Sequence, residues 1–341
     1  MSTGTNTERR RTQAPGRNER EGISLLDLAD MFGTEAQAQA WFEAQRWPDG
    51  ITCPKCGSKQ ISKRGARPGN LPPYRCNARK GGVKCGKCFS VKTDSIMHKS
   101  TLPLRKWAIA TYVVTTGLKS VSSMKLHRDL KITQRSAWHM LHRIREAWDD
   151  TERRLRFDGE VEVDEAYFGG KESNKRKHLR RTDGARGTIG KAAVIGAKER
   201  GSNQITAAAI PDTTGRTIHT FVNRAATTGA TIYTDESAAY HHLHRRHHRV
   251  NHSAGEYVRG QAHTNGIESF WAVLKRAHKG TFHHFSVKHL NRYVAEFAGR
   301  HNMRGEDTIN QMGDLVRMGV GKRLRYADLI GPKYTRYPEL I

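Results

Sequence analysis

Long apolar stretches are absent from this 341-residue sequence. The longest uncharged apolar run, residues 192–197, is far shorter than the roughly 18–20 residues that a membrane-spanning helix needs. The polar, arginine-rich start also lacks the apolar segment of a signal peptide. We therefore expect an intracellular protein without a membrane segment.

Acidic residues are scarce relative to basic ones. The chain has 33 Asp and Glu against 59 Lys and Arg, which gives a formal net charge of +26 at pH 7. This excess is typical of proteins that bind polyanions, although charge alone does not distinguish DNA from RNA or anionic lipid. Hydrophobic residues make up 36% of the chain, which is enough for at least one core and excludes wholesale disorder.

The two ends of the chain and one early segment differ in pattern. Residues 1–22 have almost no apolar side chains, so they cannot offset the entropy of ordering and are predicted to form a flexible arm. Apolar positions at helical spacing predict two short helices within 23–50, with a break at Gly33. Residues 303–341 form a basic, weakly periodic tail for which we make no structural prediction.

Residues 100–150 are predicted to form three helices. The first has Pro103 in its first turn and ends at Gly117, the second covers about 122–130, and the third begins at Thr133. Apolar and basic positions lie on different sides of the third helix: Trp138, Leu141, Ile144 and Trp148 against Arg135, His139, His142, Arg143 and Arg145. The pattern is typical of a helix-turn-helix with a basic second element, and the alternative is a small bundle whose basic face is only solvated.

Five cysteines in a protein without a secretion signal are more often metal ligands than disulfide partners. Cys53 and Cys56 are separated by two residues, so both thiolates can bind one zinc ion. Gly57 follows directly, and a glycine there relaxes the tight turn beneath the ion. The sequence therefore strongly indicates Cys53 and Cys56 as the first two ligands of a zinc site.

The second half of the zinc site is open to two interpretations. Cys76, Cys85 and Cys88 offer three sulfurs for the two remaining tetrahedral positions. Spacing alone favours Cys85 with Cys88, but Gly86 follows Cys85 as Gly57 follows Cys56. We therefore prefer Cys76 with Cys85, keep Cys88 as the alternative, and predict one structural zinc ion in a ribbon over 51–95.

After Phe157 the pattern changes from helical spacing to alternation, which indicates strands. Valines and acids alternate over 160–164, so we expect a half-buried strand with its acids facing solvent. The predicted order is three strands, a helix, a strand and two helices: 160–164, 192–197, 204–210, 215–226, 231–234, 267–278 and 287–300. Residues 157–302 thus form an α/β domain.

Three carboxylates occupy informative places in this domain. Asp164 ends the first strand, Asp235 follows the fourth, and Glu268 lies in the first turn of a later helix. If the first and fourth strands are neighbours, the three side chains converge and would bind two Mg²⁺ or Mn²⁺ ions, which suits phosphodiester chemistry. Lys275 is seven residues after Glu268, on the same helical face, and can hold a phosphate.

Each of these acids also has an ordinary interpretation. Asp164 could belong to a solvated strand face with Glu162, and Asp235 could be a turn residue or a helix cap. Asn265 and Glu268 have the spacing of a capping box. All three acids together, with Lys275 in phase, favour a catalytic site.

Two motifs resemble a known family. Residues 161–171 (VEVDEAYFGGK) and 263–271 (HTNGIESFW), followed by Lys275, resemble the first and third catalytic motifs of the Merlin-related, ISXO-like insertion-sequence transposases. Shorter matches lie at 89–91, 102–107 and 288–297. The resemblance implies a zinc ribbon, a helix-turn-helix region and an RNase H-like catalytic domain that cuts and rejoins DNA at transposon ends. It also implies that the third catalytic position is Glu268, which we prefer, or Asn265.

Two features depart from the family pattern. The step from Cys76 to Cys85 is longer than the usual spacing of two residues, and residues 93–95 read Thr-Asp-Ser where Thr-Gly-Thr is usual. Basic tracts at 171–191 and 241–249 fit either a DNA track beside the active site or solvated loops.

The sequence as a whole predicts a DNA transposase that binds terminal inverted repeats as a homodimer or larger assembly. We expect a bacterial cytoplasmic protein that is associated with the nucleoid. The expected cofactors are two Mg²⁺ or Mn²⁺ ions and one structural Zn²⁺. Two alternatives remain: a non-catalytic DNA-binding regulator derived from a transposase, and a structure-selective RNase H-like nuclease.

Overall fold

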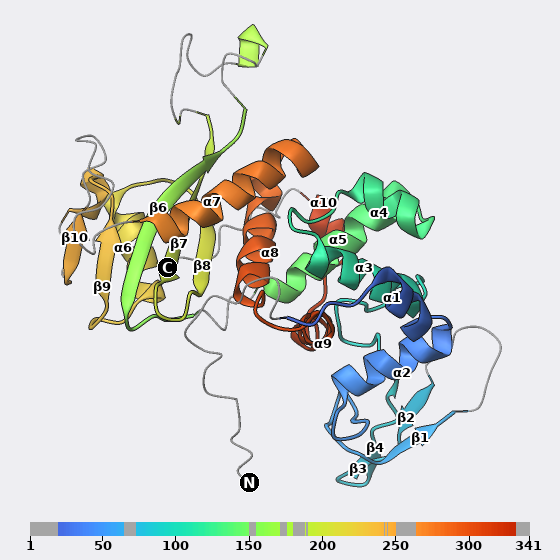
Figure 1. Ribbon diagram of the computed structural model, residues 1–341. Coiled ribbons are helices and arrows are strands. Elements are labelled where there is room, and N and C mark those ends of the chain that lie inside the picture. The colour runs from blue at the N-terminus through green and yellow to red at the C-terminus, as the bar shows by residue number, and fades with distance from the viewer. Residues whose placement is uncertain are drawn as a thin grey trace, which may run out of the picture. The chain divides into compact units, whose positions relative to one another are not determined.

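The computed structural model describes residues 20–64, 73–149, 155–170, 176–179, 188, 190–241, 243, 245–249 and 264–331. The chain divides into two compact units (Figure 1). The helical unit contains 20–148 and 306–330, and the sheet unit contains the described residues of 149–305 with Gly331. Most of the predicted flexible arm, residues 1–19, lies outside the described residues.

The helical unit begins with α1 (Leu25–Met31) and α2 (Glu35–Arg46), on either side of the predicted break. Both helices start with a capping box, made by Ser24 and by Thr34. The cysteine-rich stretch then forms a three-stranded antiparallel sheet in the order β1-β2-β5 and a separate hairpin of β3 and β4. The five strands are β1 (Ile61–Lys63), β2 (Tyr74–Cys76), β3 (Arg79–Lys80), β4 (Val83–Lys84) and β5 (Cys88–Phe89).

Three helices follow the cysteine-rich stretch, as the sequence predicts: α3 (Leu104–Thr116), α4 (Ser123–Leu130) and α5 (Gln134–Trp148). Pro103 precedes α3 at the cap position, and the Ser122 and Thr133 hydroxyls accept backbone hydrogen bonds at the starts of α4 and α5. The tail contributes α9 (Thr308–Met318), which packs on α2, α3 and α5, and α10 (Tyr326–Ile330). Sequence periodicity did not predict these two helices.

The second half of α5 differs from the predicted basic face. His142, Arg143 and Arg145 are all buried. The Arg143 guanidinium lies 5.8 Å from the centre of the Trp107 ring and donates a hydrogen bond to the His98 carbonyl. The predicted basic face of a helix-turn-helix and its alternative, a solvated face, both require these three side chains to be exposed, and this expectation is wrong. α9 packs on α5, and Arg143 lies against Trp107 of α3. Arg135, in the first turn, is exposed.

The sheet unit is built on a five-stranded mixed sheet in the order β10-β9-β6-β7-β8 (Figure 1). Its strands are β6 (Glu160–Phe168), β7 (Ala192–Glu199), β8 (Ile205–Ile210), β9 (Thr231–Thr234) and β10 (His247–Arg249). β6, β7 and β8 are antiparallel neighbours, whereas β9 runs parallel to β6 and to β10. The expectation that the first and fourth strands are neighbours is confirmed, while β10 was not predicted.

Helices cover both faces of this sheet. α6 (Gly215–Ala225) packs on one face with the side chains of Val161 and Val163. α7 (Asn265–Ala277) and α8 (Leu290–Asn302) pack on the other face with Ala166 and Phe168. The remaining short helical turns are 177–179, 238–240, 278–282 and 287–289.

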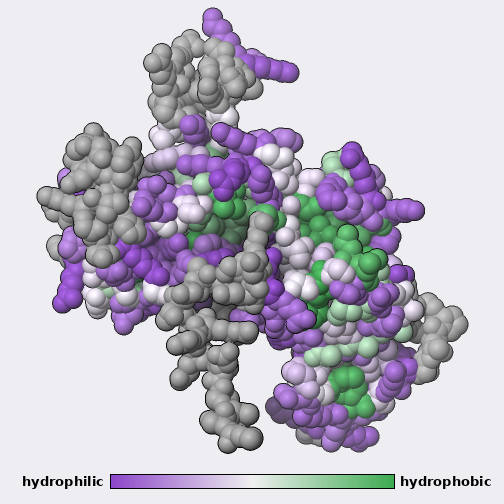
Figure 2. Space-filling model, in the orientation of Figure 1, coloured by the Kyte–Doolittle hydropathy of each residue, from purple (hydrophilic) through white to green (hydrophobic). Residues whose placement is uncertain are grey.

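The two-sided cover corrects the predicted half-buried strand. Glu162, expected to face solvent, is only 1% exposed, because β6 is a central strand and α7 lies over that face. Hydrophilic residues dominate the visible surface of both units, and hydrophobic residues form only small patches there (Figure 2). Within the described residues, none of the helices has the length and apolar character required to cross a membrane.

Gly196 lets α7 approach the sheet closely. A Cβ atom at this position of β7 would lie 2.8 Å from the Trp271 ring of α7. We predict that Gly196→Ala lowers the free energy of unfolding by about 1–3 kcal/mol, the usual cost of overpacking a core. Urea denaturation checks this, with Gly201→Ala as control because a Cβ there meets nothing within 4 Å. Equal stability of the two variants would contradict the packing described here.

Candidate functional site

Three carboxylates meet beside the middle of β6, just beyond the end of β9. Each of Asp164, Glu165 and Asp235 offers an oxygen, and these oxygens lie within 4.8 Å of one another. The register that pairs Glu160 with Thr231 also sets Asp164 opposite Asp235, just after the parallel ladder ends. The β6–β9 pairing therefore brings together two of the acids singled out by sequence, and it adds Glu165.

Burial and neighbouring negative charges raise the pKa values of Asp164 and Glu165. Burial raises the pKa of Asp164 to about 6, and the negative charges of Asp235 and Glu268 act in the same direction, while Lys275 opposes them. Burial likewise raises the pKa of Glu165 to about 7, with Asp164 and Asp235 adding to the shift. Such a cluster becomes fully ionised most readily when a cation binds to it.

α7 presents Glu268 and Lys275 on one exposed face. Glu268 is not one of the three acids grouped within 4.8 Å, although its charge and that of Lys275 both act on Asp164. The Thr264 hydroxyl donates a 3.0 Å hydrogen bond to Glu268 Oε1. Thr264 precedes the helix and Asn265 is its first residue, so the capping box of Asn265 with Glu268 is not formed.

Glu162 anchors the start of α7 to β6. Its buried carboxylate accepts a 2.9 Å hydrogen bond from the Ile267 backbone N–H and another of 2.9 Å from Arg200 Nε. Gly266 is required for this approach, because a Cβ atom there would lie 2.7 Å from both Glu162 Oε2 and Lys198 Nζ. An acid two residues before Asp164 thus fixes the helix that carries Glu268 and Lys275.

Glu165 was not singled out by sequence reasoning. Its carboxylate lies near the Tyr240 hydroxyl, and burial together with the charge of Glu165 raises the pKa of Tyr240 well above its usual range. The Tyr240 hydroxyl faces the Glu165 carboxylate and lowers its pKa, whereas Glu165 Oε1 is buried without a hydrogen bond among the described residues. The cluster therefore has a buried polar atom available to a ligand.

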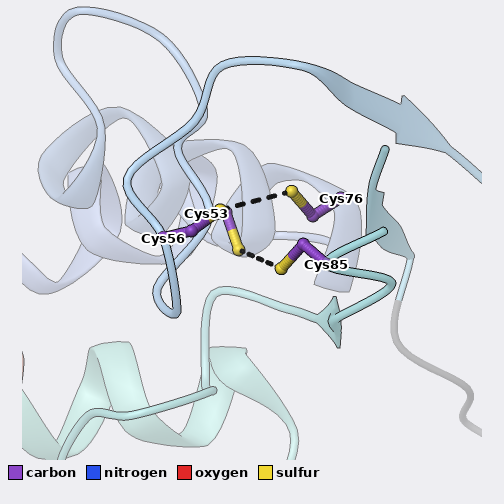
Figure 3. A group of neighbouring side chains, drawn as sticks. All are labelled: Cys53, Cys56, Cys76 and Cys85. Atoms are coloured by element: carbon purple, nitrogen blue, oxygen red, sulfur yellow. Dashed lines mark hydrogen bonds between the residues drawn. The ribbon is translucent and has the colours of Figure 1, made fainter. Parts of the chain in front are cut away.

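Four cysteines form a second cluster, in the helical unit (Figure 3). The Sγ atoms of Cys53, Cys56, Cys76 and Cys85 lie within 4.8 Å of one another, which is the set preferred from the two glycine positions. Gly57 and Gly86 have φ of +72° and +62°, so both knuckles use the left-handed turn that favours glycine. Cys88 is outside this group, and its Sγ accepts a 3.5 Å hydrogen bond from Arg64 Nη1.

The chemistry of the four thiols fits zinc. Burial raises the pKa of Cys76 to about 12, so that this thiol holds its proton unless a cation displaces it. The Lys87 backbone N–H lowers the pKa of Cys85 to about 7 and so favours its thiolate. Four converging sulfur ligands and no other ligand type match a closed tetrahedral Zn²⁺ site among the described residues.

Comparison with known proteins agrees with this arrangement. Residues 156–302 match the ISXO2-like transposase domain. The chain carries an ISXO2-like transposase domain. It is also 26% identical over 280 residues to an uncharacterized protein in the transposable element ISH50 of Halobacterium salinarum, an alignment that covers 78% of this chain and 90% of that protein. No solved structure matches.

The transposase domain includes the five strands of the sheet unit and every member of the carboxylate cluster. One predicted basic tract, 171–191, falls largely outside the described residues. Part of the other, 241–249, forms β10, where His247 Nε2 lies 2.8 Å from the Thr234 hydroxyl. This part of the tract is therefore a strand and not a loop.

We predict that protein purified without chelator contains about one equivalent of zinc, measured by atomic emission. Cys53→Ser and Cys76→Ser should lose the metal and destabilise the ribbon, because a segment this small depends on the ion to fold. Cys88→Ser is the matched control and should retain it. Loss of zinc from Cys88→Ser with retention in Cys76→Ser would show that Cys88 is the ligand instead.

Proposed function

We propose that this protein is a DNA transposase that cleaves and joins DNA strands through an RNase H-like catalytic domain. The observation that carries the proposal is the convergence of Asp164 and Asp235 where β9 ends beside β6, within the transposase domain. The fold assignment is supported by the mixed five-stranded sheet, in which the first strand lies between the second and the fourth.

The roles of the side chains follow from their places. Asp164 on β6 and Asp235 after β9 bind divalent cations. Glu268 contributes from α7 as the preferred third ligand, with Asn265 as the alternative. Two Mg²⁺ or Mn²⁺ ions would supply activation of the attacking water or 3′-hydroxyl and stabilisation of the leaving oxygen. Lys275, two turns after Glu268, binds a phosphate of the scissile strand. Glu162 holds α7 in place for both residues.

The helical unit supplies DNA recognition in this proposal. The ribbon, held by one zinc ion, and the α4–α5 pair bind the terminal inverted repeats. Two transposon ends must be brought together for joining, so the active form is a homodimer or a larger assembly on DNA.

A cleavage and joining assay tests the proposed function. Full-length protein with Mg²⁺ is expected to nick duplexes containing the inverted repeats that flank its gene and to join them to a target plasmid. Asp164→Asn, Asp235→Asn and Glu268→Gln should each reduce both products at least about 100-fold. Each change removes a ligand of the metal ions that stabilise the negative charge of the transition state. Asp30→Asn, an exposed acid on α1, is the charge-matched control.

The products separate this proposal from its rivals. Nicking without joining would identify a nuclease, and binding to the repeats without nicking would identify a regulator. Asn265→Ala in parallel decides the third position, since a loss in this variant but not in Glu268→Gln would assign that role to Asn265.

A further inference from the structure

Two hollows adjoin one another in the helical unit and share the residues of the loop 98–101. The smaller, of about 280 Å³, lies between this loop, the first half of α5 and residues 323–325. The larger, of about 920 Å³, lies between the same loop, the end of the ribbon and the starts of α2 and α3. We call the two hollows together the basic groove.

The smaller hollow is lined by cationic side chains. Lys99, Arg143, Arg323 and Arg325 line it together with His98 and His139, and none of its lining residues is an Asp or Glu. Arg325 is paired with Asp328, and Arg143 is held by the His98 carbonyl. Lys99 and Arg323 are both exposed, and neither forms an ion pair with a described residue. These two cations are therefore available to an anionic partner.

The tail of the helical unit closes this hollow against α5. His139 Nε2 lies 3.3 Å from the Leu324 carbonyl, and the Tyr326 ring is 5.4 Å from the His139 ring. The Arg135 guanidinium lies 6.0 Å from the centre of the same Tyr326 ring. Since the second half of α5 is buried, the part of this helix that can reach a partner borders the basic groove.

The larger hollow continues the positive charge toward the ribbon. Lys87, Lys92 and Arg105 line it, and the Lys92 ammonium donates a 2.6 Å hydrogen bond to the Leu102 carbonyl. Glu35 is its lining carboxylate, and its two oxygens already accept the backbone N–H groups of Leu104 and Arg105. One carboxylate therefore faces these three cations, and the hollow keeps a net positive charge.

We propose that the basic groove binds backbone phosphates of duplex DNA, with Lys99 and Arg323 as its main contacts. This inference rests on the proposed function and assigns the DNA contact to a surface made jointly by the loop 98–101 and the tail. A chain of phosphates fits better than a single small anion, because the cations extend from Arg323 to Lys87 across both hollows. Phosphate contacts here would set the register of the exposed first turn of α5 on the duplex.

The salt dependence of DNA binding tests the groove. Each phosphate contact contributes about −0.9 to the slope of log K against log salt concentration, so Lys99→Gln with Arg323→Gln should make the slope shallower by about two. The probe is a 30-base-pair duplex containing the gene's flanking inverted repeat, measured by fluorescence anisotropy with full-length protein. Lys119→Gln is the matched control, because Lys119 is exposed after the far end of α3 and lines neither hollow.

The outcomes distinguish this inference from the function on which it rests. An unchanged slope in the double variant, with zinc content and Tm as in wild type, would overturn the assignment of DNA binding to the groove. The proposed function would not be affected by that result. A shallower slope in the double variant and not in Lys119→Gln supports it. A wild-type protein that neither binds nor nicks the duplex would instead refute the proposed function.

Discussion

Crowding of carboxylates beside the middle of β6, where β9 ends, is the constraint on which the rest of the account depends. Asp164, Glu165 and Asp235 have oxygens within 4.8 Å of one another, and burial raises the pKa of Asp164 and of Glu165. Without a bound cation, some of these carboxylates must stay protonated, or their negative charges repel one another. The parallel pairing of β6 with β9 maintains the crowding, and the Glu162 contact with Ile267 holds α7 beside it.

Sequence patterns predicted the parts of this site that are set by local order and motif. Asp235 could be found because it follows a recognisable strand, and Lys275 because seven residues complete nearly two helical turns. Asp164 was expected to end its strand, but β6 continues to Phe168 and Asp164 lies in its middle. The ribbon set of Cys53, Cys56, Cys76 and Cys85 followed from the glycines after two of the cysteines. In each case the decisive signal lies within a few residues of the side chain.

Other features depend on contacts between distant segments and could not be predicted locally. Glu162 looks like a solvated strand residue until α7 covers it, and Arg143 looks like a solvated helix residue until it packs on Trp107. Asp164 and Glu165 are consecutive residues of β6, so strand periodicity assigns their side chains to opposite faces of the sheet. Their carboxylate oxygens nevertheless lie within 4.8 Å of each other and of Asp235. The tail packs as α9 against three helices that are far from it in the sequence.

Location of bound Mn²⁺ by anomalous scattering tests the central claim most directly. The account predicts manganese coordinated by both Asp164 and Asp235 in crystals of the wild-type protein, and no manganese at this place in Asp164→Asn. The same maps would show whether Glu268 or Glu165 completes the coordination. Crystals grown with millimolar Mn²⁺ that show no ion between Asp164 and Asp235 would contradict the account.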